Sequence, residues 1–253
     1  MNDTQRHKIY FASDFHLGAP DPAASLVREK KLVAWLLSIQ HDAAKIFLVG
    51  DIFDFWFEYK RAIPRGYTRL LGTLSALTDA GIEIHVFTGN HDMWIFDYLP
   101  QECGVIVHRK HIKLDWGGKR FLIGHGDGLG PGDYGYKVIK LIFANHLCQW
   151  LFARLHPNFG IWLASSLSRY SRGSTGHKDS IFLGENKEWL IIWCKEILLK
   201  EHIDYFIFGH RHYPMQIDLG QLSSYINLGE WLTEPHYAVF DNHTCTLKKW
   251  ITP

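Results

Sequence analysis

The chain has 253 residues, and its 27 Lys and Arg nearly balance its 26 Asp and Glu, giving a formal net charge of +1. Because a nucleic-acid-binding protein is expected to carry a strongly basic face, this balance predicts no nucleic-acid partner, and nothing in the sequence indicates an obligate protein partner. Residues 1–6 are polar, which predicts no secretory signal, and the four scattered cysteines without CxxC spacing predict reduced thiols in a cytoplasmic protein.

Five short apolar runs, rich in β-branched and aromatic residues, predict buried strands. In chain order they cover residues 9–12, 46–49, 84–87, 121–123 and 205–208. Each run ends in a polar segment that contains Asp, Asn or His, and in four of the five a glycine beside these residues allows a sharp turn. In open α/β sheets, ligands gather outside the carboxyl ends of the strands, so these polar side chains are expected to converge on one edge.

The converging side chains are of the types that bind metal ions. The seven candidate ligands are Asp14, His16, Asp51, Asn90, His125, His210 and His212. A single histidine after a strand is more often a loop residue, and a His-x-His motif alone is weak, but five such strand ends in order predict a site for two metal ions. Carboxylate, imidazole and amide ligands without a thiolate suit divalent Mn²⁺ as the first expectation, with Fe or Zn²⁺ as alternatives.

Two divalent ions at this edge predict the hydrolysis of a phosphoester. A pair of ions about 3.5–4 Å apart clamps the attacking and leaving oxygens and acidifies a bridging water, so that a hydroxide is the nucleophile. Asp51 is the predicted bridging carboxylate. The chain contains neither a nucleophile-elbow serine nor a P-loop, in agreement with a reaction that needs no protein nucleophile.

The order of the motifs resembles the calcineurin-like metallophosphoesterases. Asp-x-His, Gly-Asp-x-x-Asp, Gly-Asn-His-Asp, Gly-His-Gly-Asp and Gly-His-x-His follow one another between residues 9 and 212. The resemblance implies an α/β fold, a two-layer β-sheet sandwich flanked by helices, and a single metallophosphoesterase domain over residues 1–253. It also implies that one ion takes Asp14, His16, Asp51 and His212, and that the other takes Asp51, Asn90, His125 and His210.

The resemblance further implies catalytic roles for the two residues after Asn90. His91 would contact the phosphoryl oxygen or protonate the leaving group, and Asp92 would orient His91. A cation beside developing negative charge stabilises a transition state, which agrees with this role for His91. The alternative is that His91 is a hydrogen-bonded loop histidine.

Within this superfamily, the chain resembles the UDP-2,3-diacylglucosamine pyrophosphatases of lipid A biosynthesis. The resemblance is carried by SDFHLG at residues 13–18, GDIFDFW at residues 50–56 and an insertion after residue 127. It implies cleavage of this nucleotide-linked lipid to UMP and 2,3-diacylglucosamine 1-phosphate. The chain departs from the best-known branch at His91, where that branch has arginine, and at Arg211, where it has a small residue. Arg211 is interpreted as a replacement for the lost positive charge.

Two alternative functions stay open. A phosphodiesterase or phosphatase that acts on a different substrate would use the same metal site. More remotely, the chain would be a non-catalytic adaptor on the same fold, like retromer-type subunits that have lost catalytic residues. All predicted ligands and His91 are intact here, which favours an enzyme.

Residues 133–180 are predicted to form a helical insertion that caps the active site. Large apolar residues are dense over residues 136–167, and residues 157–160 predict the turn of a helical hairpin. Lysine, arginine and histidine side chains interrupt this stretch, so it cannot cross a membrane. One interpretation is an apolar wall that receives acyl chains and lies peripherally on the cytoplasmic face of the inner membrane of a Gram-negative-type bacterium. The alternative is a helical pair docked on the core.

Residues that bind the substrate are predicted in and near this insertion. Residues 168–178 predict a flexible, positively charged loop, with a solvated connector as the alternative. From this loop Arg169, Arg172 and Lys178 are expected to reach the diphosphate, because basic side chains bind phosphate oxygens. The family resemblance adds Asp133 and Tyr136 at the start of the insertion.

The rest of the chain is predicted to be scaffold. Residues 26–39, 67–78 and 186–202 have helical spacing, with Asn186 as an N-cap. The runs 224–228, 237–240 and 245–250 predict an antiparallel meander that completes the second sheet.

Overall fold

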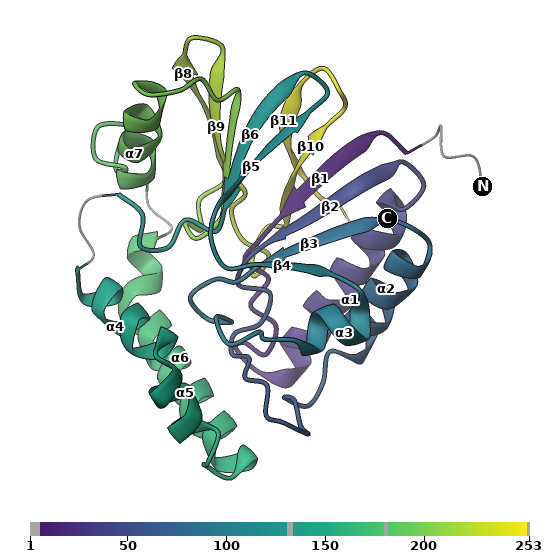
Figure 1. The fold of residues 1–253 in the computed structure, drawn as a ribbon, viewed down its shortest axis with the longest axis vertical. Coiled ribbons are helices and arrows are strands. Elements are labelled where there is room, and N and C mark those ends of the chain that lie inside the picture. Colours follow the sequence, from purple (N-terminus) through teal and green to yellow (C-terminus); the bar gives the residue numbers. More distant parts are fainter. Residues whose placement is uncertain (1–5, 131–133, 180–181, 252–253) are drawn as a thin grey trace.

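The computed structural model describes residues 6–130, 134–179 and 182–251, which form two β-sheets packed face to face with helices outside (Figure 1). The six-stranded sheet has the order β11 (Cys245–Lys249), β10 (His236–Phe240), β1 (Lys8–Ala12), β2 (Ala43–Val49), β3 (Glu83–Phe87) and β4 (Ile106–His108). The five-stranded sheet has the order β5 (Ile112–Trp116), β6 (Lys119–Gly124), β7 (Tyr205–Phe208), β9 (Ser223–Asn227) and β8 (Met215–Gly220). The predicted α/β sandwich is confirmed.

Helices cover the outer faces of both sheets and also form a projecting arm (Figure 1). On the six-stranded sheet lie α1 (Pro22–Ile39), α2 (Thr68–Asp79) and α3 (Tyr98–Cys103), and on the five-stranded sheet lies α7 (Trp189–Leu198). The helical arm consists of α4 (Tyr134–Ala144), α5 (His146–Phe152) and α6 (Pro157–Asp179), and it extends away from the body of the molecule. Within the described ranges, none of the helices has the length and apolar character needed to cross a bilayer.

The central strands are apolar on both faces, which explains the continuous apolar runs of the sequence. In β1, Ile9 and Phe11 point into the core between the sheets, whereas Tyr10 and Ala12 belong to the core beneath the helices. Between the sheets Phe11 stacks on Phe47 with ring centroids 5.2 Å apart. Burying such a side chain contributes roughly 1.5–3 kcal/mol, so this double-sided burial holds the strand ends in place.

The strands that precede the predicted ligands run parallel, so their carboxyl ends meet at one edge of the sandwich. β1, β2 and β3 are parallel neighbours in one sheet, and β6 and β7 are parallel neighbours in the other. Segments that are far apart in the sequence are therefore brought to one place.

The C-terminal strands do not form the predicted meander. β9 pairs parallel with β7 and antiparallel with β8, a strand that was not predicted. β10 instead pairs antiparallel with β1 in the other sheet, and with β11 as a hairpin. The prediction is wrong because β10 pairs with the free edge of β1. In that position Ala238 and Phe240 of β10 are buried in the core between the sheets.

Three helix predictions also need correction. α6 runs from Pro157 to Asp179, so residues 168–178 are helical and not a loop, although serine and glycine have a weak helix propensity; Ser168 at the start of this segment donates to the carbonyl oxygen of Asp54. The turn before α6 lies at residues 153–156, and Pro157 opens the helix, a position that suits proline. α7 begins at Trp189, and its N-cap is Glu188 instead of Asn186.

The helical arm contacts the body through aromatic side chains and exposes other apolar side chains. Phe152 of α5 packs against Phe55, Phe57 and Trp94, and Trp94 Nε1 donates a hydrogen bond to the carbonyl oxygen of Phe143 at 2.8 Å. Elsewhere on the arm, large apolar side chains are 49–73% exposed: Leu141, Ile142, Leu147, Trp150, Leu151, Phe159, Trp162 and Leu167. The interpretations of a docked pair and of an open apolar surface therefore each describe one part of the arm.

Candidate metal centre

Four of the predicted ligands have a left-handed backbone, which residues other than glycine rarely adopt. The φ angles of Asp14, His16, Asp51 and His210 are 56°, 44°, 50° and 66°. Such a conformation costs of order 1–3 kcal/mol and persists only where neighbours fix it. Here the backbone N–H of Asp14 donates to the Gly50 carbonyl at 3.1 Å, and that of His16 donates to the Asp51 carbonyl at 2.9 Å. These bonds join the loops after β1 and β2.

Two glycines leave room for the ligands. Gly50 has a φ of +87°, and a Cβ there would collide with the ring of His125. A Cβ on Gly89 would collide with the carboxylate of Asp51. Gly50 thus serves the sharp turn that was predicted, whereas Gly89 is required by the close approach of a neighbouring ligand.

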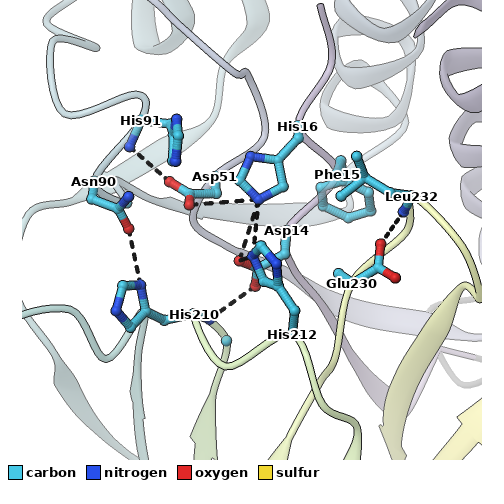
Figure 2. Close-up of polar contacts among 12 residues, drawn as sticks. Asp14, Phe15, His16, Asp51, Asn90, His91, His210, His212, Glu230 and Leu232 are labelled. Carbon is cyan, nitrogen blue, oxygen red and sulfur yellow. Dashed lines mark hydrogen bonds and ion pairs between the residues drawn. The ribbon is translucent and has the colours of Figure 1, made fainter. Parts of the chain in front are cut away.

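Asp14, His16 and His212 form one group of donor atoms (Figure 2). His16 Nε2 lies 3.1 Å from His212 Nε2 and 3.7 Å from Asp14 Oδ1. His212 Nε2 lies 3.3 Å from the same carboxylate oxygen. Two ring nitrogens that face each other share at most one hydrogen, so a positive ion between them suits the arrangement.

Asn90, His125 and His210 form a second group, and Asp51 lies between the two groups. Asn90 Oδ1 lies 2.9 Å from His210 Nδ1 and 3.2 Å from His125 Nε2. Asp51 Oδ2 lies 3.4 Å from His125 Nε2 and 3.8 Å from His16 Nε2. This is the position that a bridging carboxylate needs.

The donor atoms fit divalent metal ions. With ligand bonds of about 2.1 Å, neighbouring donors around one ion lie roughly 3.0–3.4 Å apart, close to most of the distances within each group. Among the described residues, Asp14 Oδ1 is buried and has no hydrogen-bond partner, which is the situation of an oxygen that a cation would satisfy. The cluster can therefore hold divalent metal ions.

At His125 and Asp51, charge pairing outweighs the effect of burial on the pKa. Burial disfavours a charged His125 ring, yet the neighbouring Asp51 carboxylate raises the pKa of His125 to about 10. Burial likewise disfavours a charged Asp51, but His125 and His91 beside it lower the pKa of Asp51 well below its ordinary value. The carboxylates are thus already compensated by positive charge, a role that divalent ions can take over.

His91 lies beside the first group, with its ring centroid 4.9 Å from that of His16 (Figure 2). Its backbone N–H donates to Asp51 Oδ1 at 2.9 Å. Its Nδ1 lies 3.1 Å from the carbonyl oxygen of Asp54 and 2.9 Å from Ser168 Oγ. Because a carbonyl oxygen only accepts, Nδ1 carries a hydrogen, and Nε2 is the ring atom left for other contacts.

The carboxylate of Asp92 holds backbone amides. Oδ2 accepts from the N–H of Ile52 at 2.7 Å and of Phe53 at 3.3 Å, and Oδ1 accepts from the N–H of Gly89 at 2.7 Å. Burial raises the pKa of this carboxyl to about 7. Asp92 thus joins the loops after β2 and β3. The hydrogen bonds of the His91 ring that the structure describes are made with Asp54 and Ser168 instead of with Asp92.

Asp54 and Ser168 were not predicted as site residues. Asp54 closes the Gly-Asp-x-x-Asp motif, so the motif already pointed to it. Its Oδ1 also lies 3.7 Å from His91 Nδ1 and 3.8 Å from His16 Nδ1. Ser168 lies 77 residues after His91, in a segment predicted to be a loop, and nothing in the sequence indicates its position.

Comparison of the whole sequence with known proteins adds to this geometry. The chain is 38% identical over 259 residues to a UDP-2,3-diacylglucosamine hydrolase of Porphyromonas gingivalis, covering 96% of this chain and 97% of that protein. The chain belongs to the UDP-2,3-diacylglucosamine hydrolase family. A protein of the same name from Actinobacillus succinogenes is 25% identical over 225 residues, 89% of this chain and 92% of the relative.

One solved structure agrees with the fold of this chain. A dimetal phosphatase from Danio rerio matches with a TM-score of 0.51 at 13% identity, covering 96% of this chain and 95% of that chain. No family model matches the chain. At this low identity the match supports the fold alone, and the family membership rests on the sequence relatives.

Four of the five predicted substrate contacts belong to the helical arm. Asp133 lies outside the described residues. Tyr136 is on α4, and Arg169, Arg172 and Lys178 are on α6; the structure describes their backbone but not their side chains. Their roles therefore stay predictions.

Arg211 does not have the role interpreted from the sequence. Its side chain is 3% exposed, and its Nη2 donates to Glu188 Oε1 at 2.9 Å. Glu188 is itself buried at the start of α7. A cation held in this buried pair is required to compensate Glu188, so the interpretation of Arg211 as a substrate-binding charge is wrong.

Proposed function

We propose that the chain hydrolyses the diphosphate of UDP-2,3-diacylglucosamine in lipid A biosynthesis, and that the products are UMP and 2,3-diacylglucosamine 1-phosphate. The observation that carries this proposal is a two-part cluster of oxygen and nitrogen donors beside an arm with apolar walls. The relatives named for this substrate match along nearly the whole chain, which supports the proposal.

Two divalent ions are proposed to occupy the cluster. One would be held by Asp14, His16, Asp51 and His212, and the other by Asp51, Asn90, His125 and His210. Mn²⁺ is the proposed resident ion, with Fe or Zn²⁺ as alternatives, because oxygen and imidazole donors suit all three. When bound, such ions activate water and neutralise the charge of the diphosphate.

His91 is proposed to stabilise the charge that develops on the phosphoryl group. The carbonyl of Asp54 holds its Nδ1–H, so a second proton on the ring resides on Nε2. From there the charged ring donates to a phosphoryl oxygen or to the leaving group. Asp92 supports this chemistry through the loops after β2 and β3, which it joins.

The helical arm is proposed to form a cap over residues of the site, with residues 133–180 as its limits. A cavity of about 690 Å³ lies between α6 and the body, and one of about 640 Å³ lies beneath α4 and α5. The apolar lining of the first includes Leu26, Phe55, Ile161 and Trp162, and that of the second includes Phe57, Phe96, Phe143 and Trp150. The acyl chains would lie between the arm and the body.

Five residues of this insertion remain proposed substrate contacts, namely Asp133, Tyr136, Arg169, Arg172 and Lys178. The three basic side chains would bind phosphate oxygens of the diphosphate. Arg169, Arg172 and Lys178 all belong to α6 and not to a loop.

The exposed apolar side chains of the arm support a peripheral location on the cytoplasmic face of the inner membrane. A lipid substrate resides in a bilayer, and an arm rich in exposed Leu and Trp can bury these side chains at its surface. Arg154 lies over the ring of Trp150 at 4.5 Å, so a cation is available there for anionic head groups.

The decisive experiment measures UMP release from UDP-2,3-diacylglucosamine with Mn²⁺, for the wild type and for Asp51→Asn. Without the bridging carboxylate, turnover is expected to fall roughly 100-fold or more, as for the loss of one group that stabilises a transition state. Equal UMP release by both proteins would contradict the proposed role of Asp51. Cleavage of bis-p-nitrophenyl phosphate without cleavage of the lipid would reject this substrate, and cleavage of neither would favour an adaptor.

A further inference from the structure

The helical arm reaches the catalytic site through Ser168 of α6. Ser168 Oγ lies 2.9 Å from His91 Nδ1 and 3.0 Å from the carbonyl oxygen of Asp54. We propose that Ser168 is a positioning residue for His91, so that docking of the arm completes the site for any phosphoester. This inference rests on the proposed catalytic role of His91.

The three groups form a network with one consistent arrangement of hydrogens. The Asp54 carbonyl only accepts, so His91 Nδ1–H and the Ser168 hydroxyl both donate to it. The lone pairs of Ser168 Oγ remain for Nδ1–H, which thus lies between two acceptors, at 3.1 Å and 2.9 Å. Two acceptors on one side of the ring fix both its tautomer and its rotation, so Nε2 keeps one direction.

The network depends on the position of the arm. Ser168 lies 114 residues after Asp54 in the sequence, and it reaches the site only because α6 packs there. The arm has a second anchor, where the ring of Phe152 lies 4.7 Å from that of Phe57 and 4.8 Å from that of Trp94. The same helices therefore provide the cavities for the lipid and one of the contacts of His91.

Ser168→Ala tests the inference, with Ser166→Ala as a matched control on the same helix. Ser166 Oγ donates to the carbonyl oxygen of Trp162 in its own helix at 2.7 Å, so the control removes a serine hydroxyl from the same helix, two residues away from Ser168. On bis-p-nitrophenyl phosphate, which has no acyl chain, Ser168→Ala is expected to lower kcat about tenfold with KM nearly unchanged, the scale of one hydrogen bond. Ser168→Thr keeps a hydroxyl and should recover most of kcat.

A double-mutant cycle with His91→Ala separates positioning from a purely structural role. Because Ser168 acts through the ring, Ser168→Ala should lower kcat no further in the His91→Ala background. Additive losses of kcat in the double variant would overturn the inference. An unchanged kcat in His91→Ala would also overturn it, and so would an effect of Ser168→Ala that is confined to the KM for the lipid. Unaltered thermal unfolding of the variants shows that they fold.

The proposed substrate fails in a different way. If the wild type hydrolyses bis-p-nitrophenyl phosphate but not UDP-2,3-diacylglucosamine, the substrate is rejected, while the cycle between Ser168 and His91 still decides the inference.

Discussion

Gly89 lies so close to Asp51 that the metal centre has no room for a side chain at this residue. A Cβ there would lie 2.7 Å from the backbone nitrogen of Asp51 and would collide with its carboxylate. Gly89→Ala is therefore expected to displace Asp51 and to lower Mn²⁺-dependent turnover roughly 100-fold, on the scale of losing one catalytic group. Metal analysis after dialysis should show a parallel loss of bound Mn²⁺.

Gly72 in α2 provides the control, because a Cβ on Gly72 meets nothing within 4 Å. Gly72→Ala should leave the metal content unchanged and stabilise the helix by about 0.5–1 kcal/mol. A Gly89→Ala protein with its full complement of metal would show that the collision is relieved elsewhere, against this prediction.

A sequence pattern can predict a metal ligand whose position depends on its distance from a strand end. It cannot predict a site residue whose position depends on the packing of distant segments. Asp14 and His125 could be predicted because each lies within two residues of the end of a buried strand, and the carboxyl ends of parallel strands meet at one edge. The contacts of His91 could not be predicted in the same way. Ser168 contacts that ring because α6 docks on the body. The other contact is the backbone carbonyl of Asp54, which every residue type has, so the residue type does not indicate it.

At the scale of secondary-structure elements, the edge strand β4 and its neighbour β3 carry a pair of histidines. His85 Nδ1 lies 2.8 Å from His108 Nε2, and His85 Nε2 lies 2.6 Å from Glu83 Oε1. Burial, and then the neighbouring His85, lower the pKa of His108 to about 4. The folded protein therefore favours a neutral ring at His108.

This pair predicts a loss of stability in acid. In the unfolded chain His108 has its ordinary pKa of 6.5, so between pH 6.5 and about 4 the unfolded state binds more protons than the folded state. The free energy of unfolding should be undiminished above pH 6.5 and fall by about 1–2 kcal/mol towards pH 4, a value reduced because the ring is partly exposed. Denaturant unfolding at pH 7 and pH 4.5 measures this loss.

His108→Gln provides the comparison for that experiment, because it removes the titrating ring and keeps a polar side chain at the edge. The variant should lose less stability than the wild type between the two pH values. An identical loss in both proteins would assign the acid sensitivity to other groups.

The elements themselves differ in how far the sequence predicts them. The strands with two buried faces are apparent as apolar runs, and β1 and β2 lie where they were predicted. Periodicity carries no information about partners, however, so the pairing of β10 with β1 at the other end of the chain was missed. The second half of α6 was missed because its serines and glycines locally favour a loop.

At the scale of the whole molecule, the helical arm presents apolar side chains away from the cores. Leu147 and Leu151, one helical turn apart on α5, are 64% and 54% exposed. The double variant Leu147→Glu with Leu151→Glu is expected to weaken binding to anionic phospholipid vesicles at least about tenfold, because each loses apolar burial and gains repulsion. Vesicle co-sedimentation measures this change.

Leu199 and Leu222, each 87% exposed and outside the arm, supply a matched double control. Their replacement by Glu should leave vesicle binding as in the wild type. Hydrolysis of bis-p-nitrophenyl phosphate should persist in both double variants, since neither pair lies in the metal centre. Equal vesicle binding by all three proteins would remove the arm from the membrane contact.

The predicted ligands follow strands of both sheets, so a bound ion would be tied to two layers of the fold. Asp14, Asp51 and Asn90 follow strands of the six-stranded sheet, whereas His125 and His210 follow strands of the five-stranded sheet. Unfolding must release the ions, and a hundredfold excess of metal over its Kd stabilises the folded state by about 2.7 kcal/mol. The midpoint of thermal unfolding should therefore rise roughly 5–10 °C with Mn²⁺ and return with EDTA.

In Asp51→Asn the midpoint of thermal unfolding should hardly change with Mn²⁺ or EDTA. A wild-type midpoint that changes with neither Mn²⁺ nor EDTA would contradict the prediction that bound ions stabilise the fold. The consequence reaches beyond catalysis. A chain whose two sheets are joined through bound ions would be less stable without them, so metal starvation would expose it to proteolysis at the same time as it stops turnover.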